Sequence, residues 1–108
     1  MKDDKVYLHS ILESIVKIET YTNSGKEEFM TSGIIRDAVI RNLEIIGEAA
    51  KRVSQGLKEQ TAEIPWRQMA GLRDVLIHDY MGISLNIVWN VVQNELPQLK
   101  RKMVECLE

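Results

Sequence analysis

The sequence contains one cysteine, Cys106, and two histidines among its 108 residues. A single thiol cannot form a disulfide within the chain, so a disulfide framework does not hold this fold together. One cysteine and two histidines are also fewer than the four cysteine or histidine ligands of a structural zinc site. We therefore expect neither a disulfide-stapled domain nor a zinc-binding one.

The chain also lacks an excess of positive charge and any long apolar run. It has 14 lysines and arginines against 16 aspartates and glutamates, which makes its formal net charge −2. A protein that coats nucleic acid is normally basic, so any phosphate binding here must come from a local cluster. No run of eighteen apolar residues and no secretory signal pattern is present. We expect a cytoplasmic protein that does not enter a membrane.

Two prolines and six glycines are few, which favours long regular elements. With 44% hydrophobic and 28% charged residues, the composition is that of a globular chain, and we treat residues 1–108 as one domain. Apolar residues recur at helical spacing. The predicted helices are Asp4–Tyr21, a helix capped by Ser32 that ends near Val53, Pro65–Ile77, and a helix capped by Ser84 with a kink at Pro97; Lys26–Met30 forms a short turn. The sequence therefore predicts an all-α bundle of four to five helices.

The third predicted helix leads into the most informative stretch, Arg73 to Tyr80. At about 100° per residue, Arg73 lies on an apolar line with Trp66, Ala70 and Ile77, and the line continues to Tyr80. Burying a charged guanidinium without a partner is costly. The arginine therefore needs either a structural partner or a chemical role.

His78 lies on a different face of the same helix. Asp74 stands one turn before it, where a carboxylate can orient or charge-stabilise the imidazole. Histidine is also the side chain whose ordinary pKa suits proton transfer near neutral pH. The five-residue step from Arg73 to His78 rotates by about 140°, so the two side chains point apart on an ideal helix. Either the helix unwinds near Ile77, or the arginine reaches round, or a second chain completes the site.

Each of these residues also has a purely structural interpretation. An arginine in an apolar stripe is often half of an ion pair, and a histidine near a helix C-terminus complements the helix dipole. A lone tyrosine is usually a core-edge aromatic. Asn42, in the apolar stripe of the second helix, either fixes helix or dimer register as a buried amide or supports an active site. Gly47 and Gly71 fall inside helices, where glycine costs about 1 kcal/mol, so we expect a close helix or subunit approach there.

The spacing Arg73-x4-His78-x-Tyr80 resembles the R-x4-H-x-Y signature of HepT-like proteins, which belong to the HEPN superfamily of all-helical ribonucleases. No residue of the signature departs from that pattern. Four further segments resemble the family, so that the likeness spans essentially the whole chain: Lys2–Lys5, Arg36–Ala49, Ile64–Trp66 and Leu96–Pro97.

The resemblance implies a HEPN-like helical bundle that forms a two-fold homodimer, with the two motifs facing a shared cleft. It implies a metal-independent endoribonuclease, without a cofactor, that acts on RNA such as tRNA or mRNA. It also implies a toxin whose antitoxin, an MntA-like minimal nucleotidyltransferase, transfers AMP to the motif tyrosine. By position, Arg73 and His78 would be catalytic and Tyr80 the modified residue. Asp74 and Asn42 are the candidates for supporting roles because of their places in the helices.

Two other functions are compatible with the sequence. One is a non-catalytic helical module that binds a nucleotidyltransferase partner or a nucleotide, and the other is a purely structural dimeric bundle. The joint presence of arginine, histidine and tyrosine favours the ribonuclease, since a binding module can dispense with the histidine. The acidic composition favours the binding module.

Overall fold

The computed structural model describes residues 3–108, and all the regular structure in that range is helical. The α-helices are α1 (Asp4–Tyr21), α2 (Lys26–Thr31), α3 (Gly33–Arg52), α4 (Gln55–Gln60), α5 (Trp66–His78), α6 (Leu85–Asn90) and α7 (Leu96–Leu107). A 3₁₀ turn, Tyr80–Gly82, follows α5, and a π-helical turn, Val91–Glu95, joins α6 to α7. The predicted all-α class is confirmed. Lys2, part of the N-terminal segment that resembles the HepT-like family, lies outside the described residues.

Side-chain caps determine where several helices begin. Asp3, Ser32, Ser54 and Ser84 each accept a hydrogen bond from a backbone N–H in the first turn of α1, α3, α4 and α6, respectively. The caps predicted at Ser32 and Ser84 are confirmed. The short helix α4 was not predicted. Its cap Ser54 also donates from its backbone N–H and its hydroxyl to Asp4, at 2.9 and 2.6 Å, which ties α4 to the start of α1.

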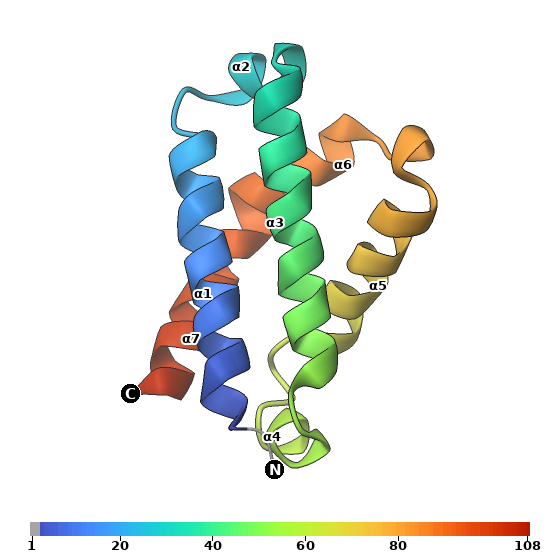
Figure 1. The fold of residues 1–108 in the computed structure, drawn as a ribbon. Coiled ribbons are helices and arrows are strands. Elements are labelled where there is room, and N and C mark those ends of the chain that lie inside the picture. Colours follow the sequence, from blue (N-terminus) through green and yellow to red (C-terminus); the bar gives the residue numbers. More distant parts are fainter. Residues whose placement is uncertain (1–2) are drawn as a thin grey trace.

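Helix α3 lies at the centre of the bundle, with α1 packed on one side and α5 on the other (Figure 1). The rod formed by α6, the π-helical turn and α7 runs obliquely behind α1 and α3 in Figure 1; α6 contacts α2, and α7 contacts α1. A π-helical turn directly precedes α7, and the proline lies in the first turn of that helix, while the kink predicted at Pro97 stays a prediction. The missing N–H of the proline breaks no α-helical hydrogen bond at that position.

The core forms where these helices meet. Its most completely buried large side chains are Phe29, Ile11, Ile15, Ile18, Leu76, Met103, Val39 and Val88. Leu76 comes from α5 and therefore anchors the helix that carries Arg73 and His78. Within residues 3–108, no helix is both long enough and apolar enough to cross a membrane.

Candidate functional site

A groove of about 390 Å³ lies between α1, α3 and α5. Its lining includes Tyr7 from α1, Glu48 and Arg52 from α3, and Arg73 and Ile77 from α5. Of the three signature residues, only the arginine lines this groove. The groove therefore places Arg73 against the charged face of α3.

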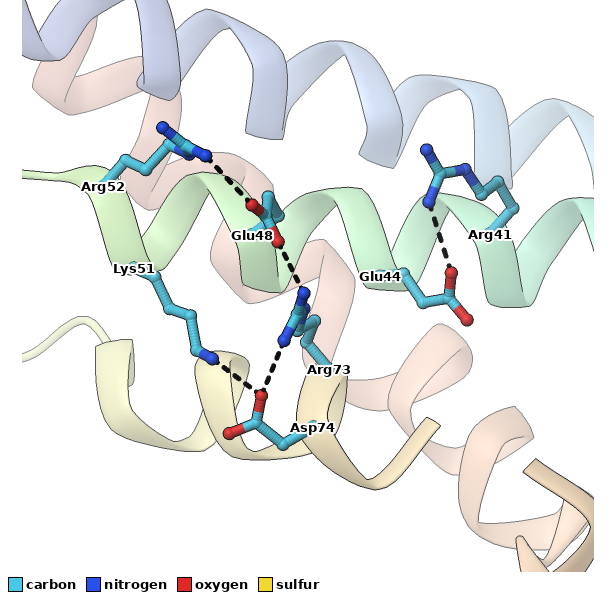
Figure 2. Close-up of polar contacts among 7 residues, drawn as sticks. All are labelled: Arg41, Glu44, Glu48, Lys51, Arg52, Arg73 and Asp74. Carbon is cyan, nitrogen blue, oxygen red and sulfur yellow. Dashed lines mark hydrogen bonds and ion pairs between the residues drawn. The ribbon is translucent and has the colours of Figure 1, made fainter. Parts of the chain in front are cut away.

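Carboxylates on two helices hold Arg73 in place (Figure 2). Its Nη2 lies 2.9 Å from Glu48 Oε2 on α3, and its Nη1 donates to Asp74 Oδ1 on α5 at 3.0 Å. The arginine side chain is 23% exposed, and its Nε is buried without a hydrogen-bond partner in the described part of the chain. The ion-pair partner that an arginine in an apolar stripe needs is therefore present, and the guanidinium has a defined orientation.

Gly47 allows α3 and α5 to approach closely at this point. A Cβ atom at Gly47 would lie 2.2 Å from Arg73 Cβ and 2.7 Å from the carbonyl oxygen of Met69, which leaves no room for any side chain. The close helix approach expected at Gly47 is confirmed. At Gly71 a Cβ would meet nothing within 4 Å, so the expected approach of another helix is wrong within this chain. An approach of a second subunit to Gly71 stays a prediction.

Asp74 pairs with α3 instead of with His78, which corrects the expectation that this carboxylate orients the imidazole. Lys51 donates from Nζ to Asp74 Oδ1 at 2.7 Å, and the same oxygen accepts from Arg73. These hydrogen bonds, chiefly the one from Lys51, lower the pKa of Asp74. No hydrogen bond joins Asp74 to His78 within residues 3–108. The crossing of α3 over α5 brings Lys51 to the carboxylate, and the second cation, Arg73, is its neighbour on α5.

The five residues Lys51, Asp74, Arg73, Glu48 and Arg52 form a continuous ion-pair network (Figure 2). A hydrogen bond from Arg52, together with the positive charge of Arg73, holds the pKa of Glu48 below its usual value. Three cations against two carboxylates leave the network with one excess positive charge. The network is therefore the candidate for the local positive cluster that phosphate binding by an acidic chain requires.

His78 is the last residue of α5, and its ring is exposed and makes no hydrogen bond to any of residues 3–108. Because α5 stays helical through His78, the helix does not unwind near Ile77. The guanidinium of Arg73 is turned towards α3, so the arginine does not reach round to the histidine. Arg73 and His78 are therefore not brought together within this chain. Of the three ways to bring them together, only completion of the site by a second chain remains open.

Tyr80 contacts the beginning of α3, well away from Arg73. Its hydroxyl donates to Asp37 Oδ1 at 2.6 Å, and its side chain is 43% exposed. The expected alignment of Tyr80 with Arg73 on one helical line is wrong, because α5 ends at His78 and Tyr80 lies in the 3₁₀ turn. Asp37 and Glu48, the contact points of Tyr80 and Arg73 on α3, are roughly 16 Å apart along the helix axis at 1.5 Å per residue.

Asn42 is buried, with 6% of its surface exposed, as the interpretation of a structural amide predicts. Its Nδ2 donates to the carbonyl oxygen of Ala38 at 2.9 Å, and its Oδ1 has no partner among the described residues. No hydrogen bond links it to the signature residues, so its supporting role stays a prediction. In residues 3–108 no three His, Cys, Asp or Glu side chains are arranged to hold a metal ion.

Asp37 and Glu48 are partners of the signature residues that were not predicted from the sequence. Both lie in the Arg36–Ala49 segment that resembles the HepT-like family. Their place in that segment was the only sign in the sequence that they belong to the site. The contact of Glu48 with Arg73 depends on how α3 crosses α5, and the contact of Asp37 with Tyr80 depends on the path of the chain after His78.

Comparison with known proteins identifies the family. A family model described as ribonuclease HepT-like matches residues 11–106. The chain belongs to this HepT-like family. It is 43% identical over 102 residues to the "Probable ribonuclease HepT" of Thermococcus cleftensis, a match that covers 94% of this chain and 93% of that protein.

A second relative of this HepT-like chain is a longer protein. It is described as a gamma-glutamylcyclotransferase and candidate RNase of Methanocaldococcus jannaschii, and it is 45% identical over 108 residues. The match covers 99% of this chain and 49% of that relative, so the chain spans about half the length of that protein.

Among solved structures, the chain resembles the tri-AMPylated Shewanella oneidensis HEPN toxin, which was determined in complex with MNT antitoxin. The TM-score is 0.73 at 24% sequence identity, and the match covers 98% of this chain and 99% of that chain. This likeness confirms that the helical bundle has the HEPN fold.

Proposed function

We propose that this HepT-like chain is a metal-independent endoribonuclease, the toxin of a HEPN/MNT pair that cleaves tRNA or mRNA. The proposal rests chiefly on Arg73, whose guanidinium lies in a groove and is held there by Glu48 and Asp74. The helix that carries Arg73, α5, ends at the exposed His78. The names of its relatives support the same class of activity.

Arg73 binds the scissile phosphate in this proposal. Its planar fork suits two phosphate oxygens, and its positive charge stabilises the negative charge that develops on them. Glu48 and Asp74 compete for the same N–H groups, but both carboxylates are partly exposed. Exposed ion pairs contribute little to stability, so an arriving phosphate can displace them at little cost.

His78 moves the proton. RNA carries its own nucleophile, the 2′-hydroxyl, so the enzyme has to remove a proton from that group or deliver one to the departing 5′-oxygen. General acid–base catalysis by a placed histidine typically accelerates a reaction by roughly 10²–10⁴-fold. The ring of His78 is exposed and free of hydrogen bonds to other described residues, and so it is accessible to a substrate.

A two-fold homodimer supplies the missing part of this site. Within one chain, Arg73 pairs with Glu48 on α3, while His78 makes no hydrogen bond to any of the described residues. Two-fold symmetry brings two copies of each residue to one interface. We therefore propose that the motifs of two chains face a common cleft, in which arginine and histidine act together on one phosphate.

Tyr80 is the proposed site of inactivation by an MntA-like nucleotidyltransferase antitoxin. AMP on its hydroxyl adds bulk and a negative phosphodiester two residues along the chain from His78, and in the shared cleft of the proposed dimer it would obstruct RNA and weaken the attraction for it. The hydroxyl is accessible to such an enzyme because the side chain is 43% exposed. Peptide mass spectrometry after incubation with the partner and ATP tests this step, and an unmodified Tyr80 counts against it.

Cleavage of purified tRNA and mRNA by the purified chain, with a chelator present, tests the ribonuclease proposal. The wild-type chain should cut RNA, and Arg73→Ala and His78→Ala should each lose most of the activity. Cleavage that survives both substitutions would refute the assigned site. Freshly purified, unmodified wild-type protein that cleaves no RNA but binds a nucleotidyltransferase partner or a nucleotide would instead support the non-catalytic module.

A further inference from the structure

The hydroxyl of Tyr80 has a single hydrogen-bond partner in the described part of the chain, the carboxylate of Asp37 on α3. The two oxygens, Tyr80 Oη and Asp37 Oδ1, are 2.6 Å apart, and the tyrosine is the donor. Within residues 3–108, Asp37 forms no ion pair, and its carboxylate accepts the hydrogen bond from the Tyr80 hydroxyl. The pair is exposed at the surface, where a second protein can reach it.

We propose that Asp37 is the general base for modification of Tyr80, accepting the hydroxyl proton as the tyrosine oxygen attacks a nucleoside triphosphate. The inference rests on the modification of Tyr80 proposed above and adds a residue to it. A base must lie within about 2.6–3.2 Å of the proton-bearing atom, and the Asp37 carboxylate meets that requirement before any nucleotide arrives.

The proposed step balances in atoms and charge. A bond forms between Tyr80 Oη and the α-phosphorus, and the bond from that phosphorus to the oxygen bridging to the β-phosphorus breaks. Pyrophosphate leaves, the nucleoside monophosphate stays on the tyrosine, and the phenol proton passes to the Asp37 carboxylate. Protein kinases use an aspartate in the same way when a substrate hydroxyl attacks a phosphoryl group.

The surroundings of the hydroxyl show why a base is needed. The hydrogen bond to Asp37 raises the pKa of Tyr80 because the carboxylate accepts from the neutral phenol and repels the phenolate. Also on α3, the charge of Arg36 lowers the pKa of the phenol and the charge of Glu44 raises it, both more weakly. Near neutral pH the hydroxyl therefore keeps its proton until it reacts, and the proton must leave during the attack.

The test compares initial rates of AMP transfer to Tyr80 by an MNT-type nucleotidyltransferase, the class of antitoxin proposed above, with Mg-ATP as donor. Asp37→Asn keeps an oxygen that can accept the hydroxyl hydrogen bond but cannot take up its proton. We expect a loss of about 100-fold at neutral pH, within the usual range for removal of a general base. Asp37→Glu, which keeps a carboxylate, should recover part of the rate.

Glu44→Gln is the matched control. Glu44 lies seven residues after Asp37, on the same face of α3, and acts on Tyr80 through its charge without a hydrogen bond. Its removal should change the AMP-transfer rate by less than about threefold, equivalent to less than 1 kcal/mol. A loss as large as that in Asp37→Asn would mean that negative charge alone matters and would overturn the assignment of a base.

The pH dependence separates a base from a merely positioning contact. As the pH rises from about 7 to about 9.5 it approaches the ordinary pKa of a phenol. Asp37→Asn lacks the carboxylate that raises the pKa of Tyr80, so its phenol begins to ionise without a base and the rate ratio of wild type to Asp37→Asn should fall steadily. A constant ratio, or an Asp37→Asn variant as fast as wild type, would overturn this inference while leaving the modification intact. A wild-type Tyr80 that stays unmodified would overturn the modification and this inference together.

Discussion

Gly47 on α3 and Arg73 on α5 lie so close together that a methyl group on the glycine would overlap the arginine side chain. The contact explains how an arginine in an apolar stripe reaches the carboxylate of Glu48, since the helices could not come this near with any other residue at position 47. The position of the candidate phosphate-binding group therefore depends on a residue that takes part in none of the chemistry.

Replacing Gly47 with alanine should destabilise the fold and displace Arg73. The added Cβ would meet the backbone oxygen of Met69 as well as the arginine, so α3 and α5 must separate. Overpacking of this kind costs about 1–3 kcal/mol, which urea unfolding measures. Gly71→Ala is the control, because it adds the same methyl group to open space and should stabilise the helix by roughly 0.5–1 kcal/mol. If both variants lost the same free energy of unfolding, the close approach of α3 and α5 at Gly47 would not be the cause of the destabilisation.

Replacing His78 with glutamine should abolish most RNA cleavage while leaving the fold intact. The ring is exposed and unbonded within the described residues, so the free energy of unfolding should change by less than about 0.5 kcal/mol. The cleavage rate should fall by roughly 10²–10⁴-fold if the imidazole transfers a proton. His9→Gln removes the other exposed histidine and should leave cleavage unchanged. Similar losses in the two variants would argue against a specific role for His78.

A mixture of two inactive variants should regain activity if the site is shared between chains. An Arg73→Ala chain still supplies His78, and a His78→Ala chain still supplies Arg73, so their mixed dimer contains one intact composite site. With random exchange of subunits, half of the dimers are mixed and each has one of two sites, so about one quarter of the wild-type rate should return. No recovery after verified subunit exchange would mean that both residues act from one chain.

Acid should weaken the fold through the network around Arg73. The pKa values of Glu48 and Asp74 are lower in the folded chain than their usual values of 4.5 and 3.8. The unfolded chain therefore binds protons more readily, and this contribution to stability is present above those values and lost as pH falls through the folded ones. Urea midpoints measured from about pH 6 to about pH 3 should fall less steeply in a Glu48→Gln/Asp74→Asn double variant than in wild type. If the urea midpoints of wild type and the double variant fell equally with pH, Glu48 and Asp74 would not be the source of the acid sensitivity.

Local signals explain why the helices could be predicted from the sequence. Ser32 and Ser84 cap α3 and α6, and Pro65 immediately precedes α5. Apolar residues at helical spacing then predict that each helix continues. The missed helix α4 contains only six residues, too few to show a period, although its cap Ser54 was a visible signal. The long helices begin and end close to their predicted bounds, whereas the short turn predicted at Lys26–Met30 is the helix α2.

The partners of the site residues could not be predicted in the same way. Asp74 was matched with His78 because the two share a helical face, but Lys51 comes from α3 and lies 2.7 Å away. The contact between Tyr80 and Asp37 depends on the path of the chain after α5, which has no periodic pattern. These contacts depend on how separate helices pack against each other. In the sequence, the packing of α3 on α5 is indicated only by Gly47, which permits their close approach.

The rod formed by α6 and α7 also determines the order in which the fold can be completed. Lys100 on α7 donates to Glu19 on α1, 81 positions earlier in the chain, whereas α3 and α5 are near neighbours in sequence. Contacts between distant segments form late, because a long loop must close first. During synthesis, α3 and α5 leave the ribosome before α7 does. The ion pairs around Arg73 can therefore assemble on the nascent chain while the core beside α1 is still open.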